Sequence, residues 1–163
     1  MSEILERIGT VQIARPQVLT YYEAQLEPSV GNYYLRSFLP NFILNTEDDH
    51  LKVAVWRLKR NAIESKILAE IRGRPISFDH FVYIFKEQAI GLWDGTPSEA
   101  KGILARFGGA QDAVSLILSK DKDGKDCWIL AQSMECRRWI LTHYPCHSSQ
   151  QSWTGFRFIC AEA

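Results

Sequence analysis

The chain has 163 residues, 46% of them hydrophobic and 23% charged, which fits one globular domain with its own core and excludes global disorder. The formal net charge is zero, so the protein as a whole has no electrostatic attraction to nucleic acid or anionic lipid. No apolar run reaches the roughly 18–20 residues that span a bilayer. The first seven residues lack a signal-peptide pattern, so the four cysteines indicate reduced thiols. We expect a cytoplasmic protein without membrane contact.

Residues 1–40 are predicted to form a helical N-terminal segment. An apolar face formed by Val18, Tyr21, Tyr22 and Leu26 favours a helix between Pro16 and Pro28, and a second aromatic stretch favours a short helix before Pro40. No low-complexity linker separates this segment from the rest. We therefore treat residues 1–163 as a single domain.

A short phrase recurs three times: Ile-Leu-Ala-Glu-Ile at 67–71, Ile-Leu-Ala-Arg-Phe at 103–107 and Ile-Leu-Thr-His-Tyr at 140–144. Recurrence at a period of about 20–50 residues is typical of a stacked supersecondary unit. Amphipathic helices also share such patterns without any duplication, and this alternative stays open.

Each copy of the phrase is predicted to lie on a helix. The clearest signal is Thr96-Pro97-Ser98-Glu99, a capping sequence followed by an apolar stripe that ends at Gly108-Gly109. Asn61 is expected to cap the first helix, which ends at Gly73. Ser133 is expected to cap the third, which ends before Pro145.

A hairpin is predicted before each helix: 42–46 with 51–58, 82–85 with 89–93, and 113–119 with 126–131. In the third hairpin a three-residue loop, Lys122-Asp123-Gly124, pairs Asp121 with Lys125 and Lys120 with Asp126. A two-residue turn at Asp123-Gly124 would set Asp121 against Asp126, so the longer loop is favoured. Residues 156–160 supply a closing strand.

The predicted fold class is therefore α+β: a mainly antiparallel sheet with helices on one face, built from three strand-strand-helix units and a closing strand over residues 41–163. Each helix has one apolar stripe and must bury it against the sheet.

The C-terminal half, about residues 82–161, resembles an RNA-recognition motif, a ferredoxin-like domain. The helix ending Ala-Arg-Phe-Gly at 105–108, the hairpin at 119–125 and the ending Gly-Phe-Arg-Phe-Ile-Cys-Ala at 155–161 carry the resemblance. It implies a strand-helix-strand-strand-helix-strand order and base stacking on aromatics of the third strand. That strand, residues 125–131, has Trp128 as its one aromatic and lacks the family's glycine.

Between Lys52 and Arg74 the chain has seven basic and two acidic residues, and Trp56 lies within this stretch. Several cations on one surface, with an aromatic that can stack a base, are typical of nucleic-acid binding. The alternative is a solvated face on which charges pair locally. The candidate nucleic-acid-binding residues are Lys52, Trp56, Arg57, Lys59, Arg60, Arg72 and Arg74.

Catalytic and metal patterns are incomplete. Asp49 followed by Glu64-Ser65-Lys66 has the spacing of a nuclease metal site, but the chemistry needs Glu64 and Lys66 on one strand face, and the stretch is predicted to be helical. Cys136 and His143 would lie about 10 Å apart on a helix, too far for one zinc ion, and Cys146 and His147 lack a Cys-x-x-Cys partner.

We therefore expect no cofactor and no bound metal. The sequence predicts a non-enzymatic binding or adaptor domain whose partner is a protein or a nucleic acid. The alternative is a small metal-dependent hydrolase or nuclease.

Overall fold

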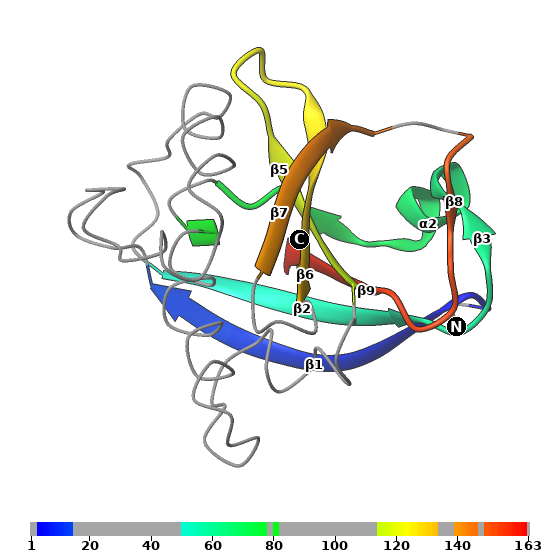
Figure 1. Ribbon diagram of the computed structural model, residues 1–163. Coiled ribbons are helices and arrows are strands. Elements are labelled where there is room, and N and C mark those ends of the chain that lie inside the picture. Colours follow the sequence, from blue (N-terminus) through cyan, green and yellow to red (C-terminus); the bar gives the residue numbers. More distant parts are fainter. Residues whose placement is uncertain are drawn as a thin grey trace.

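The computed structural model describes residues 3–14, 50–77, 80–81, 114–133, 139–146 and 149–162 (Figure 1). Strands hold 63% of these residues and helices 11%. The predicted α+β class, with helices on one face of an antiparallel sheet, is therefore wrong. The described part of the chain forms a mixed seven-stranded sheet with one short helix, α2.

The main sheet has the order β1-β2-β9-β5-β6-β7, with β4 beside β9, and a second sheet pairs β3 with β8. All of these pairs are antiparallel except β5 with β9, which is parallel. The strands are β1 Leu5–Ala14, β2 His50–Leu58, β3 Ala62–Ile63, β4 Gly73–Arg74, β5 Val114–Lys120, β6 Asp126–Ser133, β7 Trp139–Pro145, β8 Gln151–Ser152 and β9 Arg157–Glu162. In Figure 1, α2 and the β3–β8 ribbon lie together at one end of the long β1–β2 pair.

Strand β1 lies within the segment that the sequence predicted to be helical, so this part of the prediction is wrong. It pairs with β2 from Leu5↔Leu58 to Ala14↔His50, with a bulge between Arg7 and Gly9. The reason lies in residues 8–13, where β-branched side chains recur and favour the extended chain.

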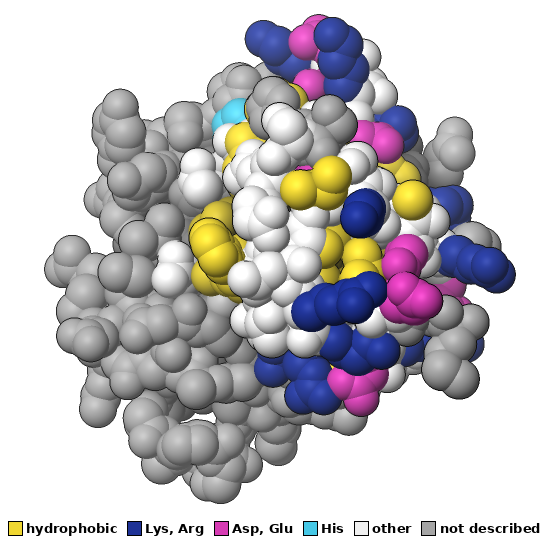
Figure 2. Space-filling model, turned by 90° about the vertical axis from the view of Figure 1, so that its right-hand side faces the viewer, with side chains coloured by type: hydrophobic (Ala, Val, Ile, Leu, Met, Phe, Trp, Pro, Cys, Tyr) yellow, Lys and Arg dark blue, Asp and Glu magenta, His cyan; other side chains and the backbone are white. Residues whose placement is uncertain are grey.

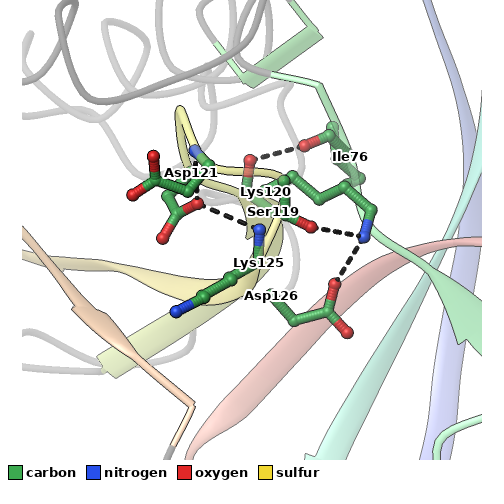
Figure 3. A network of polar contacts seen from close by, with 8 residues as sticks. Ile76, Ser119, Lys120, Asp121, Lys125 and Asp126 are labelled. Carbon is green, nitrogen blue, oxygen red and sulfur yellow. Dashed lines mark hydrogen bonds and ion pairs between the residues drawn. The ribbon is translucent and has the colours of Figure 1, made fainter.

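The β5–β6 hairpin confirms the predicted strands and register. Lys120 pairs with Asp126 in the ladder, and the Asp121 N–H donates to the Lys125 carbonyl at 2.9 Å. Gly124 has φ of 77°, the left-handed conformation that glycine adopts most readily. The Asp121 carboxylate accepts hydrogen bonds from the Asp123 and Lys125 N–H groups at 2.9 and 3.0 Å (Figure 3), so local charge and turn chemistry determine this turn.

The third predicted helix is wrong, because residues 139–145 form strand β7, paired with β6 from Cys127↔Pro145 to Ser133↔Trp139. Trp, Ile, Thr and Tyr in this stretch suit a strand, and β6 offers it a ladder of hydrogen-bonding groups. Ser133 is accordingly the last residue of β6 and not a helix cap. β7 also occupies the place at which the resemblance to an RNA-recognition motif expects a second helix.

The first predicted helix is confirmed as α2, Glu64–Glu70, although its start differs. Ile63 is at the cap position without a side-chain hydrogen bond, and the predicted cap, Asn61, instead accepts hydrogen bonds from Thr154. Of the apolar stripe, Ile67 and Ile71 are buried, and they join the core formed by Ala54, Leu58, Leu116, Trp128 and Phe158. The Trp128 and Phe158 rings meet edge to face at 5.4 Å.

Strands β5 and β9 lie in the middle of the sheet and are buried on both faces, from Val114 to Ser119 and from Phe158 to Ala161. The predicted closing strand at 156–160 is thus confirmed as β9, between β2 and β5. The predicted elements at 16–28, 33–40, 42–46, 82–93 and 96–109 lie outside the described residues. Since residues 67–71 lie mostly on a helix and 140–144 on a strand, these two copies of the phrase do not mark one repeated element.

Candidate functional site

The seven residues predicted to bind nucleic acid do not share one surface. Successive side chains of a strand point to opposite faces, so Trp56 and Arg57 of β2 lie on opposite sides of the sheet. Lys52 lies on the face of Trp56. Lys59 and Arg60 follow β2, Arg72 follows α2, and Arg74 belongs to β4.

Lys52 and Arg74 belong to a charged group around Glu162. Lys52 Nζ lies 3.3 Å from a Glu162 carboxylate oxygen, and Arg74 Nε donates to the Glu162 carbonyl at 3.1 Å. Arg7, which the sequence did not single out, forms an ion pair with the same carboxylate. The three cations come from β1, β2 and β4, but this carboxylate already accepts contacts from two of them.

Trp56 lies beneath this group and is not placed to stack a base. The Arg7 guanidinium carbon is 5.8 Å from the centroid of its ring, and its indole nitrogen is buried. The ring packs against the core, on the side of Ala54 and Cys160. The aromatic predicted to contact nucleic acid therefore serves as a packing residue here.

A second group forms where the chain leaves β2 and where it enters β9. The Leu58 N–H donates to the Phe156 carbonyl, and the Gly155 N–H donates to the Leu58 carbonyl, both at 2.9 Å. Asn61 Oδ1 accepts hydrogen bonds from the Thr154 N–H at 2.8 Å and from its hydroxyl at 2.9 Å. These bonds hold residues 58–61 beside the turn at 153–156.

Trp153 belongs to that turn, and its exposed fraction is 57%, which is unusual for so large an apolar side chain. The turn is compact: the Phe156 N–H donates to the Trp153 carbonyl at 3.1 Å, and Gly155 has φ of 93°. We call the group formed by Trp153 and the cations of these two joined segments the Trp153 surface; its members are Arg57, Lys59, Arg60, Trp153 and Arg157.

The cations of the Trp153 surface are partly neutralised. Arg57 Nε donates to Glu6 at 3.1 Å and Arg60 donates to Glu3 at 3.2 Å, and all four side chains are substantially exposed. Arg57 and Arg157 are directly opposite in the β2–β9 ladder. Burial, with a smaller contribution from the charge of Arg57, lowers the pKa of Arg157, which still carries its charge at neutral pH.

Figure 2 shows the molecule from the side on which α2 and the β3–β8 ribbon lie. Lys and Arg side chains gather over the lower part of this view with Asp and Glu side chains among them, and hydrophobic side chains lie above them. A separate charged group at the top of the view lies on the same projecting end as the β5–β6 turn. The face thus combines cations, fewer anions and exposed apolar groups.

The nuclease pattern does not assemble on α2. Glu64 is buried with an exposed fraction of 1%, whereas Lys66 is exposed, so the two side chains cannot act on one metal-bound water. Asp49 lies outside the described residues. Within the described ranges no group of three His, Cys, Asp or Glu side chains is placed to hold a metal ion, and Cys136 and His147 lie outside those ranges.

The thiols are poor nucleophiles where the structure describes them. Burial raises the pKa of Cys127 to about 12, and the charges of Asp121 and Asp126 add to this effect. Burial and the nearby Glu64, which also hydrogen-bonds the thiol, raise the pKa of Cys146 to about 12. Burial also raises the pKa of Cys160. Since the thiolate is the reactive form, these cysteines fit packing roles.

Ser77 and His80 form a side-chain pair that the sequence did not predict. Ser77 Oγ and His80 Nδ1 are 2.7 Å apart, and His80 is buried. The Phe81 N–H donates to the Ser77 carbonyl at 3.0 Å, and the Ser77 hydroxyl contacts the side chain three residues later. We interpret this contact as a local structural one.

Trp153 and Arg157 were also not among the candidate binding residues predicted from the sequence. A signal was present, because Trp153 is a single aromatic within the polar stretch Ser149-Gln150-Gln151-Ser152 and Thr154-Gly155, which is typical of a turn. Trp56 was predicted to stack a base instead, because it lies close to the cations of residues 52–74 in the sequence.

No protein-family model, no curated protein and no solved structure matches this chain. In the part of the chain that the structure describes, no helix has the length and apolar character needed to cross a membrane. The functional argument therefore depends on the geometry of the chain's own residues.

Proposed function

We propose that this protein is a non-enzymatic binding domain that binds nucleic acid through the Trp153 surface. The observation that carries the proposal is the pairing of two chain segments, 57–61 and 153–157, which together hold an exposed tryptophan and four cations. Cations contact phosphates and provide most of the affinity of such sites, and an exposed aromatic contacts bases.

The ion pairs with Glu3 and Glu6 are compatible with this function. An exposed ion pair contributes only about 0–1 kcal/mol, so Arg57 and Arg60 can exchange a carboxylate for a phosphate at small cost. The four cations of the surface outnumber the two carboxylates, Glu3 and Glu6, that pair with Arg60 and Arg57. The zero net charge of the whole chain does not oppose a local surface of this kind.

The experiment is a salt titration of binding. Fluorescence anisotropy with a labelled oligonucleotide between 50 and 200 mM salt gives the slope of log K against log salt. Four phosphate contacts predict a slope of about −3, since each contributes about 0.7–0.9. We expect Lys59→Gln with Arg60→Gln to reduce the slope by about half.

The control is Lys122→Gln with Lys125→Gln, which removes the same charge from the exposed β5–β6 turn. We expect this control to bind as the unsubstituted protein does. Absence of binding at 50 mM salt, a slope near zero, or equal losses in the two double variants would each overturn the proposal. A slope near zero would direct attention to a protein partner instead.

A further inference from the structure

We propose that the Trp153 surface selects single-stranded over double-stranded nucleic acid, and that Glu3 and Glu6 contribute to this selection. The inference rests on the proposed function and specifies its ligand. The inference concerns whether the nucleic acid is single-stranded or double-stranded. It does not distinguish DNA from RNA, because both offer a stackable base beside a phosphate.

The first argument is the placement of Trp153. Its ring is exposed, while its backbone is held by the Phe156 N–H on one side and by the Thr154–Asn61 hydrogen bonds on the other. A ring on a pre-ordered turn stacks a base without the cost of ordering a loop. In a duplex both faces of each base are covered by neighbours, so only an unpaired base can use this ring.

The second argument is the β3–β8 ribbon next to the turn. Ala62 and Ser152 are opposite each other and buried, whereas the next pair, Ile63 and Gln151, is exposed. Trp153 continues this alternation on the exposed side, and Ile63 has an exposed fraction of 36%. Ile63, Gln151 and Trp153 therefore lie on one exposed side of the ribbon, an arrangement that suits an extended strand with splayed bases.

The third argument is electrostatic. Glu3 and Glu6 lie at hydrogen-bond distance from Arg60 and Arg57, and the burial of Ile4 and Leu5 between them anchors the backbone of this segment. The Lys59 N–H also donates to the Ile4 carbonyl at 2.8 Å. Two carboxylates are thus held among the cations, and they repel a duplex, whose phosphates are denser than those of a single strand.

Together these arguments predict a higher affinity for the single strand than for the duplex. Stacking on one aromatic raises affinity about 5- to 150-fold per base, and this gain is available to an unpaired strand alone. The cations act on both forms. A surface with a strong stacking group and reduced net charge therefore favours the single strand.

The test compares a labelled single strand of about twelve nucleotides, as DNA and as RNA, with the duplex of the same sequence, by anisotropy at one salt concentration. We expect the single strands to bind at least tenfold more tightly. Trp153→Ala should weaken single-strand binding about tenfold or more and leave duplex binding unchanged, whereas Trp153→Phe should retain most of the affinity. Circular dichroism and thermal unfolding verify that each variant is folded.

Glu3→Gln with Glu6→Gln should strengthen duplex binding more than single-strand binding. Equal binding of the two forms, or a Trp153→Ala variant that keeps its preference, would overturn this inference while the proposed function stands. If the protein bound neither form, the proposed function itself would fail.

Discussion

An alanine at position 73 tests the packing of β4 against β9. A Cβ atom added to Gly73 would lie 2.2 Å from Cys160 Sγ, 2.8 Å from the Ala161 carbonyl oxygen and 2.9 Å from Cys160 Cβ. Cys160 is fully buried, so its thiol has no free direction in which to move. Overpacking of this kind costs about 1–3 kcal/mol, and the lower entropy of the unfolded alanine chain offsets about 0.5 kcal/mol of it.

We therefore expect Gly73→Ala to lower the free energy of unfolding by about 2 kcal/mol, or the Tm by about 4–8 °C for a chain of this size. Urea unfolding followed by circular dichroism measures the change. In a Cys160→Ala background the sulfur contact disappears while the other two remain, so the cost should fall by about 1 kcal/mol without vanishing.

Gly124→Ala is the matched control. No atom lies within 4 Å of its added Cβ, and only its φ of +77° opposes a side chain. This substitution should cost about 1–2 kcal/mol in either background. The packing argument fails if Gly73→Ala is as stable as the unsubstituted protein, or if its cost is the same with and without the Cys160 thiol.

Three further predictions concern other described residues. The folded protein keeps the Cys127 thiol protonated up to a pKa of about 12, whereas the unfolded chain releases this proton near 9.0, so stability should fall as the pH rises above 9. Between pH 8 and pH 10, the free energy of unfolding measured with urea should fall by about 1 kcal/mol less for Cys127→Ala than for the unsubstituted protein. Equal decreases in the two proteins would contradict the raised pKa of Cys127. Ser119→Ala removes the 2.6 Å hydrogen bond to the Ile76 carbonyl and should cost about 1–3 kcal/mol by the same assay; an unchanged midpoint would show that this bond contributes nothing. Asp121→Ala should cost about 1–2 kcal/mol of stability because its carboxylate accepts hydrogen bonds from two backbone N–H groups. Lys120→Ala should cost under about 1 kcal/mol because its ion pair with Asp126 is half exposed. A larger cost for Lys120→Ala than for Asp121→Ala would refute this account of the turn.

The features that the sequence predicted correctly depend on neighbours in the chain. The β5–β6 turn follows from a glycine in the left-handed conformation and from charges that pair across the loop, such as Lys120 with Asp126. The helix at 64–70 follows from its apolar stripe. Its cap was mispredicted because the Asn61 side chain is engaged by Thr154, which lies 93 residues away in sequence.

The features that the sequence mispredicted depend on distant pairing. Residues 140–144 fit a helical stripe and a strand alternation equally well, and the ladder of β6 selects the strand. β1 was assigned to a helical segment although its β-branched residues favour a strand, and its partner β2 lies far along the chain. Because the sequence does not show where β1, β7 and β9 lie in the sheet, the prediction placed helices over one face of that sheet.

The candidate site shows the same dependence on pairing. A base can stack only on an exposed ring, and exposure within a strand is decided by the face that a residue occupies. Trp56 and Arg57 are adjacent in the chain, yet β2 sends one beneath Arg7 and the other toward Glu6. Nucleic acid that contacts Arg57 therefore cannot reach Trp56 across the sheet. Trp153 lies nearly a hundred residues further along the chain, but hydrogen bonds join its turn to residues 58–61, the segment that holds Lys59 and Arg60, so it is the tryptophan whose substitution should alter binding.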